Sequence, residues 1–261
     1  MKEIILSKLN EIERENNIKI ILAVESGSRA WGFPSTDSDY DVRFIYTRPY
    51  DWYLSIDKKR DVLENPINDL LDISGWDIQK ALRLFAKSNP ALLEWLQSPI
   101  IYKENFTLPN VLRELSGEFM VKKGCIYHYL HMADGNYRDY LQGETVKIKK
   151  YFYVLRPLMA CMWVEKYSTV PPVEFQELLK LDGLNKNLLN QIDKLLIRKM
   201  VGEEMSLEKS IPVINEFIEE KLEYYKNYVK TIEEKNIVDF SKLNNIFLST
   251  LREVWGKQNE L

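Results

Sequence analysis

The chain has 261 residues, of which 45% are hydrophobic and 29% charged, and its formal net charge is −3. A hydrophobic fraction of this size is typical of a folded globular protein and excludes a disordered chain. The slightly acidic balance excludes a protein that coats nucleic acid through bulk positive charge.

The first part of the chain mixes helix and strand signals. Apolar residues recur at helical spacing over residues 1–15 and predict a helix there. Short runs rich in β-branched residues then predict strands. These runs cover residues 18–24, 40–46, 61–63 and 70–73. We therefore expect a small mixed β-sheet domain over residues 1–105.

From Trp76 onward the sequence predicts helices, and prolines mark several of their starts and ends. The whole chain is thus expected to be an α+β protein, with an all-helical domain over residues 106–261 that closes one side of a cleft. No stretch approaches the roughly 20 apolar residues of a membrane span. The first residues are amphipathic and rich in Glu, unlike a signal peptide, so we expect a cytoplasmic protein without a membrane partner.

The most informative segment joins the first two predicted strands. Gly27 and Ser28 close the first strand, while Asp39 and Asp41 open the second. Residues i and i+2 of a strand share a face, so the two carboxylates are expected side by side, where they could bridge magnesium ions. Gly27 allows close approach of a phosphate, which Ser28 and Arg29 could bind. An acidic surface turn would also contain Asp-x-Asp, but the Gly-Ser pair about a dozen residues earlier favours a binding site.

These residues resemble the signature of the DNA polymerase β-type nucleotidyltransferase superfamily. The segment from Ser26 to Arg43, with the segments over residues 72–100 and 149–164, resembles most closely the bacterial and phage nucleotidyltransferases associated with RNA repair. The resemblance implies transfer of a nucleoside monophosphate from an NTP, such as ATP, to an acceptor hydroxyl. It also implies a palm-like arrangement of the sheet domain and two Mg²⁺ or Mn²⁺ ions, with Asp39 and Asp41 as catalytic metal ligands.

The superfamily normally adds a third carboxylate in an apolar–Asp–apolar pattern on a neighbouring strand. Asp72, between Leu71 and Ile73, fits this pattern and is our expected third catalytic ligand. Asp77 is a second candidate, but its odd offset from Asp72 aims it at the opposite face of a continuous strand. We expect Gly75 to end the strand and Asp77 to cap the next helix.

Basic residues on two predicted helices complete the expected nucleotide site. Lys80 lies in the first turn after Asp77, and we expect it close to the third carboxylate and bound to a phosphate. Lys149, Tyr153 and Arg156 share one helix face and suit the phosphates and base of a nucleotide, although ordinary surface charge would give the same pattern.

The acceptor stays open at this level. An RNA 3′ end is one candidate, and a protein side chain or a small-molecule hydroxyl are the others. A different class of function is a nucleotide-binding, antitoxin-like protein without activity, and the presence of all three carboxylates counts against it. A purely structural nucleic-acid-binding module is disfavoured because residues 1–105 hold 17 acidic against 14 basic residues.

Overall fold

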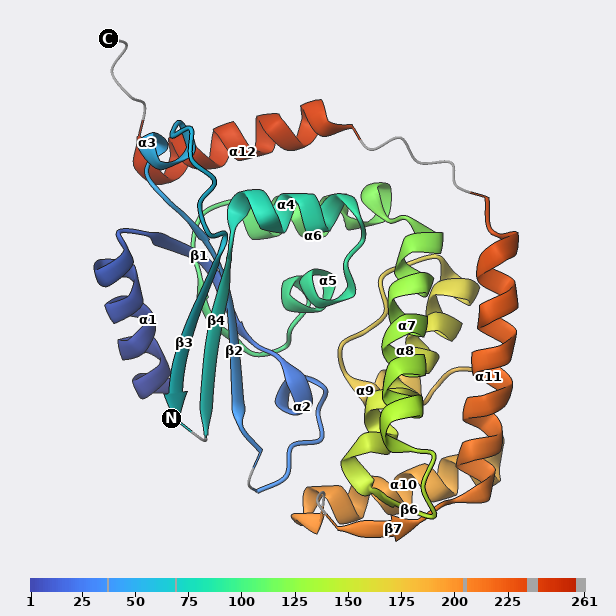
Figure 1. Cartoon of the computed structure of the whole chain (residues 1–261). Coiled ribbons are helices and arrows are strands. Elements are labelled where there is room, and N and C mark those ends of the chain that lie inside the picture. The colour runs from blue at the N-terminus through green and yellow to red at the C-terminus, as the bar shows by residue number, and fades with distance from the viewer. Residues whose placement is uncertain (37, 69, 204–205, 234–238, 257–261) are drawn as a thin grey trace.

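A computed structural model of the chain describes residues 1–36, 38–68, 70–203, 206–233 and 239–256. Two parts lie side by side, one built on a β-sheet and the other made almost entirely of helices (Figure 1). The predicted α+β class is confirmed.

The sheet of the first part has five strands in the order β3-β4-β2-β1-β5. They are β1 (Lys19–Glu25), β2 (Tyr40–Thr47), β3 (Val62–Asn68), β4 (Leu71–Asp77) and β5 (Ile101–Glu104). β2 and β4 pair in parallel and all other neighbours pair antiparallel, so the predicted mixed sheet is confirmed. The strands predicted over residues 61–63 and 70–73 extend several residues further as β3 and β4.

Strand β4 continues through Gly75 to Asp77, so the prediction that Gly75 ends this strand is wrong. Gly75 pairs with Phe44 of β2, and a Cβ atom at Gly75 would lie 2.2 Å from an atom of the Phe44 ring. The glycine therefore makes room for an aromatic ring on the sheet and does not break the strand.

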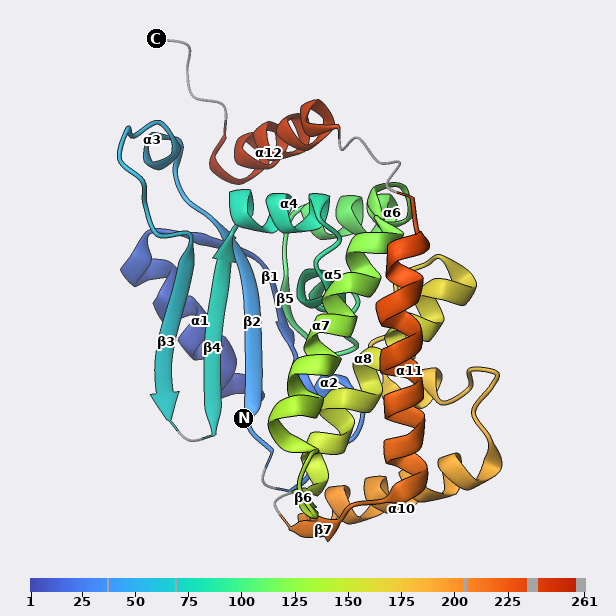
Figure 2. The same cartoon turned by 45° about the vertical axis from the view of Figure 1, so that its right-hand side comes forward.

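Over the described residues, the first part contains six helices, and one of them, α1 (Lys2–Asn16), covers one face of the sheet. The others are α2 (Gly27–Ala30), α3 (Tyr50–Tyr53), α4 (Ile78–Ala86), α5 (Pro90–Leu96) and α6 (Leu108–Phe119). Helix α1 packs on one face, against a cluster that includes Val42 and Phe44 (Figure 2). Because side chains alternate along a strand, Asp41 and Arg43 lie on the opposite face.

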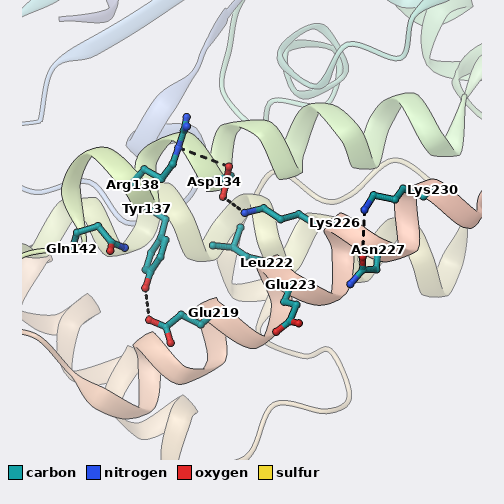
Figure 3. A pocket seen from close by; sticks show the side chains of 10 residues that line it. All are labelled: Asp134, Tyr137, Arg138, Gln142, Glu219, Leu222, Glu223, Lys226, Asn227 and Lys230. Atoms are coloured by element: carbon teal, nitrogen blue, oxygen red, sulfur yellow. Dashed lines mark hydrogen bonds and ion pairs between the residues drawn. The ribbon is translucent and has the colours of Figure 1, made fainter.

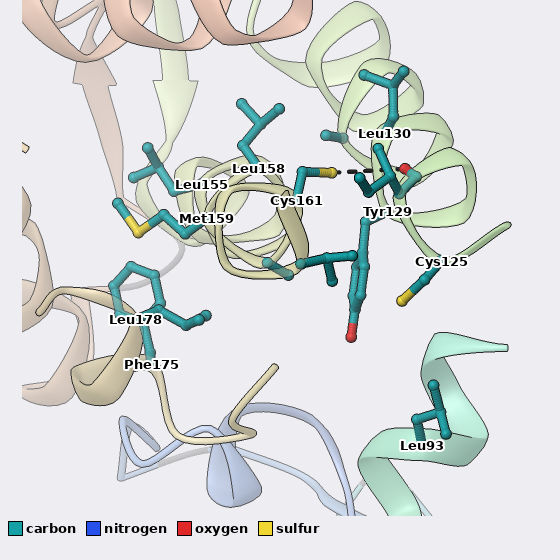
Figure 4. Packing of buried hydrophobic residues seen from close by; sticks show 14 of the residues in the cluster. Leu93, Cys125, Tyr129, Leu130, Leu155, Leu158, Met159, Cys161, Phe175 and Leu178 are labelled. Atoms are coloured by element: carbon teal, nitrogen blue, oxygen red, sulfur yellow. Dashed lines mark hydrogen bonds between the residues drawn. The ribbon is translucent and has the colours of Figure 1, made fainter. Parts of the chain in front are cut away.

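The helices of the second part pack around α8. They are α7 (Lys122–Tyr140), α8 (Ile148–Tyr167), α9 (Phe175–Leu178), α10 (Lys186–Met200) and α11 (Pro212–Thr231), with a ribbon of β6 (Thr145–Lys147) and β7 (Leu207–Lys209) at one end. Leu155 and Met159 of α8 are fully buried on one side of this helix, and Cys161 lies on the side that faces Tyr129 of α7 (Figure 4). Within the described residues, no helix combines the length and apolar character needed to cross a membrane.

The last helix, α12 (Phe240–Trp255), returns to the first part and packs on α4 (Figure 1). Glu253 of α12 accepts a hydrogen bond of 2.7 Å from the Thr107 hydroxyl. One buried hydrophobic cluster also runs from β1 and β2 through α7 and α8 to α11. The segments expected as separate domains, residues 1–105 and 106–261, thus share a core, and the end of the second segment lies on the first.

Candidate active site

The turn after β1 brings the backbone against a carboxylate. Gly27 has a φ of 60°, in the left-handed region that favours glycine. A Cβ atom at Gly27 would lie 2.2 Å from Oδ2 of Asp41. Glycine is therefore required here by its backbone angle and by its neighbour.

Two of the predicted carboxylates lie on neighbouring strands. Asp41 of β2 is the register partner of Asp72 of β4, and paired strands lie about 4.8 Å apart. Arg43 donates hydrogen bonds to Oδ1 of Asp41, at 3.0 Å, and to Oδ2 of Asp72, at 2.7 Å. Arg43 was not among the predicted site residues, although the period of two that pairs Asp39 with Asp41 also places Arg43 on this face.

The electrostatics of this pair favour a positive charge between the carboxylates. Burial raises the pKa of the Asp41 carboxyl above its ordinary value, and the guanidinium of Arg43 opposes that shift. The nearby charges of Asp72 and Asp39 raise the same pKa further. A cation between Asp41 and Asp72 relieves this repulsion.

Asp39 lies outside the paired residues of β2 and β4, although its charge acts on Asp41. It is exposed and lies just ahead of β2. Among the described residues, no group of three or more His, Cys, Asp or Glu side chains is placed to hold a metal ion. The donor set of Asp41 and Asp72 nevertheless fits magnesium, because this ion often takes one or two carboxylates and completes its shell with water and substrate phosphates.

Ser28 and Arg29 both contact the acidic segment that precedes β2. The Arg29 guanidinium donates to the backbone oxygens of Ser38, at 2.6 Å, and Asp39, at 3.0 Å, and lies 3.7 Å from the centre of the Tyr40 ring. The Ser28 hydroxyl donates to the Ser38 hydroxyl at 3.2 Å. The structure thus places both predicted phosphate ligands beside the carboxylates, where they hold the segment from Ser38 to Tyr40.

Glu25 holds the backbone of Asp41 in position. Glu25 is fully buried, and its Oε1 accepts a hydrogen bond of 2.8 Å from the backbone N–H of Asp41. Its other oxygen accepts from the Tyr102 hydroxyl. Burial raises the pKa of Glu25 above its ordinary value. A glutamate that ends an apolar strand, directly before a Ser-Gly-Ser turn, is the sequence signal that could have pointed to this role.

Asp77 and Lys80 lie at the other end of β4. Asp77 accepts a hydrogen bond of 2.8 Å from the backbone N–H of Gln79, so the predicted helix cap is confirmed. Five residues of strand separate Asp77 from Asp72, about 17 Å at roughly 3.3 Å per residue. Lys80 pairs with Asp61 at 3.2 Å at that far end, so the prediction that it lies close to Asp72 is wrong.

Arg156 is buried between helices and does not lie at the surface of the candidate site. Its side chain is 1% exposed and pairs with Glu94 at 2.7 Å. It also donates to the backbone oxygen of Val173 and lies 4.7 Å from the centre of the Trp31 ring. The prediction that Arg156 contacts a phosphate is wrong, because its guanidinium is buried and forms an ion pair that joins α8 to α5.

Tyr153 reaches the turn that carries Gly27. Its ring lies edge-on to Trp31, with the ring centres 6.0 Å apart, and the backbone N–H of Trp31 donates to the Gly27 oxygen. Lys149 lies one turn earlier on α8 and is half-buried. Of the three residues predicted on this helix, Tyr153 and Arg156 both contact Trp31 of the turn, and of these two Tyr153 is the one that is partly exposed.

A groove between α7 and α11 lies away from the carboxylates (Figure 3). It has a volume of about 790 Å³, and several of its charged side chains have partners within the groove. Asp134 contacts Lys226 at 2.6 Å and Arg138 at 3.8 Å, while the Tyr137 hydroxyl donates to Glu219. None of the predicted site residues lines this groove.

Comparison with known proteins identifies the family of the chain. The family described as RlaP, RNA repair pathway DNA polymerase beta family, matches residues 1–249. A Bacillus subtilis (strain 168) protein, "Uncharacterized protein YcgL", is 52% identical over 255 residues, which cover 98% of each chain. A crystal structure of a nucleotidyltransferase-like protein from Exiguobacterium sibiricum aligns with 95% of this chain and 80% of its own, with 15% identity and a TM-score of 0.33. The chain therefore belongs to the RNA repair pathway DNA polymerase beta family, which indicates a nucleotidyltransferase of the polymerase β type.

Proposed function

We propose that this protein transfers a nucleoside monophosphate from an NTP to the 3′ hydroxyl of an RNA. The hydroxyl oxygen attacks the α-phosphorus, and the bond from that phosphorus to the oxygen bridging to the β-phosphate breaks. Pyrophosphate leaves with the bonding electrons, and the hydroxyl proton passes to solvent. The observation that carries the proposal is the pairing of Asp41 with Asp72 beside the Gly27 turn.

Each residue at the site has a role in this reaction. Asp41 and Asp72, with Asp39 nearby, would hold two Mg²⁺ or Mn²⁺ ions, which activate the attacking hydroxyl and stabilise the leaving oxygens when bound. Ser28 and Arg29 would exchange their loop contacts for oxygens of the triphosphate. Positioning and charge neutralisation supply most of the catalysis in phosphoryl transfer, so no nucleophilic side chain is required.

Two features support a nucleic acid as the acceptor. The description of the family refers to an RNA repair pathway. In addition, Lys150 lies 3.4 Å from the centre of the Tyr140 ring and 5.1 Å from that of Tyr153, so aromatic rings and a cation alternate from the Gly27 turn along α8 and α7. Aromatic rings interleaved with basic residues stack bases and bind the backbone of single-stranded nucleic acids.

The test incubates the protein and Mg²⁺ with each of the four NTPs and a short RNA that ends in a 3′ hydroxyl. Pyrophosphate release and extension of the RNA are measured together. We expect both, and expect neither with EDTA, with the same RNA blocked by a 3′ phosphate, or with the variant Asp41→Asn. Pyrophosphate release with label in protein or a small molecule would overturn the RNA acceptor. NTP binding without pyrophosphate release under any condition would overturn the enzymatic function.

A further inference from the structure

The guanidinium of Arg43 lies where the two strand carboxylates meet. It binds one oxygen of each, Oδ1 of Asp41 and Oδ2 of Asp72, and donates a further hydrogen bond of 3.3 Å to the backbone oxygen of Asp72. Its side chain is 19% exposed. Its Nη2 donates to both carboxylates and its Nη1 donates to the backbone oxygen, so three charge-assisted hydrogen bonds fix the position of the guanidinium.

Little other room is left around the Asp41 carboxylate. Its Oδ2 lies against Gly27, where even one added carbon would come within 2.2 Å, and its Oδ1 is taken by Arg43. A divalent ion that bridges Asp41 and Asp72 must therefore compete with Arg43 for at least one of the oxygens. Two cations so close also repel each other.

We propose that Arg43 is a gate that controls the binding of metal ions to Asp41 and Asp72. The part of this inference that involves the NTP rests on the proposed function. In the nucleotide-free protein, Arg43 neutralises the Asp41–Asp72 pair and weakens the binding of free divalent ions. When an NTP arrives with its metal, Arg43 gives up the carboxylates and binds oxygens of the triphosphate, which approach from the same face of the sheet. Metal and nucleotide therefore bind cooperatively, because the nucleotide offers Arg43 a new partner.

The experiment measures Mn²⁺ affinity by calorimetry, without nucleotide and with a non-hydrolysable NTP analogue. For the wild-type protein we expect weak binding of free Mn²⁺ and an increase of at least about tenfold with the analogue, within the usual range of coupling between sites. For Arg43→Gln we expect at least about tenfold tighter binding of free Mn²⁺ and a clearly smaller effect of the analogue. Arg43→Lys should lie between the two because an ammonium keeps the positive charge but lacks the second nitrogen, which binds the backbone oxygen of Asp72.

A matched control removes the same charge elsewhere. Arg60 is exposed, pairs with Glu64 and lies two residues before the start of β3, at the Asp77 end of the sheet, so Arg60→Gln should bind Mn²⁺ like the wild type. If Arg43→Gln does not fold, the intermediate affinity of Arg43→Lys decides the question. Unchanged or weaker binding of free Mn²⁺ by the Arg43 variants would overturn the gate.

The two proposals fail in different ways. Tighter binding of free Mn²⁺ by Arg43→Gln, without RNA extension by the wild type, would support the competition for the carboxylates and overturn the proposed function. RNA extension by the wild type, with the same Mn²⁺ affinity in both proteins, would support the function and overturn the gate.

Discussion

Gly27 occupies a position where one methyl group would collide with a carboxylate. We expect Gly27→Ala to lower the free energy of unfolding by about 1 kcal/mol or more, because alanine is strained at a φ of 60°. The new Cβ must also push Oδ2 of Asp41 out of place, so nucleotidyl transfer should fall more than stability does. Urea denaturation and pyrophosphate release measure the two effects.

Gly135 provides the control for this substitution. It lies inside α7 with a negative φ, and a Cβ atom there would meet nothing within 4 Å. We expect Gly135→Ala to raise the free energy of unfolding by about 0.5–1 kcal/mol, the usual helix preference for alanine, and to leave transfer unchanged. Equal effects at Gly27 and Gly135 would contradict the close approach to Asp41.

The charges of Asp41 and Asp72 can be removed without changing their shape. Asp41→Asn and Asp72→Asn should each lower kcat on the order of 10²-fold, because the lost charge helps to hold ions that stabilise the transition state. Folding should survive, since each substitution removes one of several clustered negative charges. Steady-state kinetics with thermal melts measure both. A variant with normal kcat would show that its carboxylate is not a metal ligand.

Strand β4 carries two aspartates with different tasks at its two ends. Asp72 is 59% exposed and pairs with Arg43, whereas Asp77 is fully buried, caps α4 and accepts a hydrogen bond of 2.7 Å from the Tyr53 hydroxyl. The difference follows from the offset of five residues, which places the two side chains on opposite faces of one strand. Asn caps helices about as well as Asp, so Asp77→Asn should leave transfer almost unchanged.

Asp77 also makes stability depend on pH at the junction of β4 and α4. Burial raises the pKa of Asp77 from 3.8 to about 6. Its contribution to stability is therefore present below about pH 4 and is lost as the pH rises through 6, by about 3 kcal/mol in total. We expect Asp77→Asn, which cannot titrate, to gain stability relative to the wild type by that amount between pH 4 and 7. Urea denaturation at several pH values measures it, and parallel profiles of the two proteins would contradict the buried, titrating carboxyl.

At the scale of the whole molecule, a buried polar network joins the two parts behind the Gly27 turn. Glu94 of α5 accepts hydrogen bonds from Arg156 of α8, at 2.7 Å, from the Tyr129 hydroxyl, at 3.0 Å, and from the Trp31 indole, at 3.4 Å. Since Trp31 belongs to the turn that follows β1, the network ties that turn to both α7 and α8. The relative placement of the sheet and the helices is thus fixed close to the candidate site.

Arg156→Met tests whether this arginine stabilises the fold or binds substrate. It leaves the Glu94 charge buried without its ion pair, so we expect a loss of about 3–5 kcal/mol in the free energy of unfolding. The double variant with Glu94→Gln should recover part of this loss, while KM for the NTP should change little in the folded protein. An increase in KM with normal stability would instead show that Arg156 binds the phosphates of the NTP.

The sequence by itself determined the local features of this protein. Periodicity predicted β1 and β2, and the glycine at residue 27 predicted a close approach, although of a phosphate. The cap at Asp77 was predicted correctly, although the reason given, a strand that ends at Gly75, was wrong. These features depend on a few neighbouring residues, so local physics decides them. Which residue Gly27 approaches, however, is a contact between segments.

Only the tertiary structure decided which of the predicted site residues meet. The parallel register of β2 and β4 brings Asp72 to Asp41 and places Arg43 between them, while Lys80 is carried to the far end of the sheet. The packing of α5 against α8 similarly buries Arg156 on Glu94. A periodic pattern gives the face of its own element on which a side chain lies, but the neighbour that covers that face is set by pairing between distant segments.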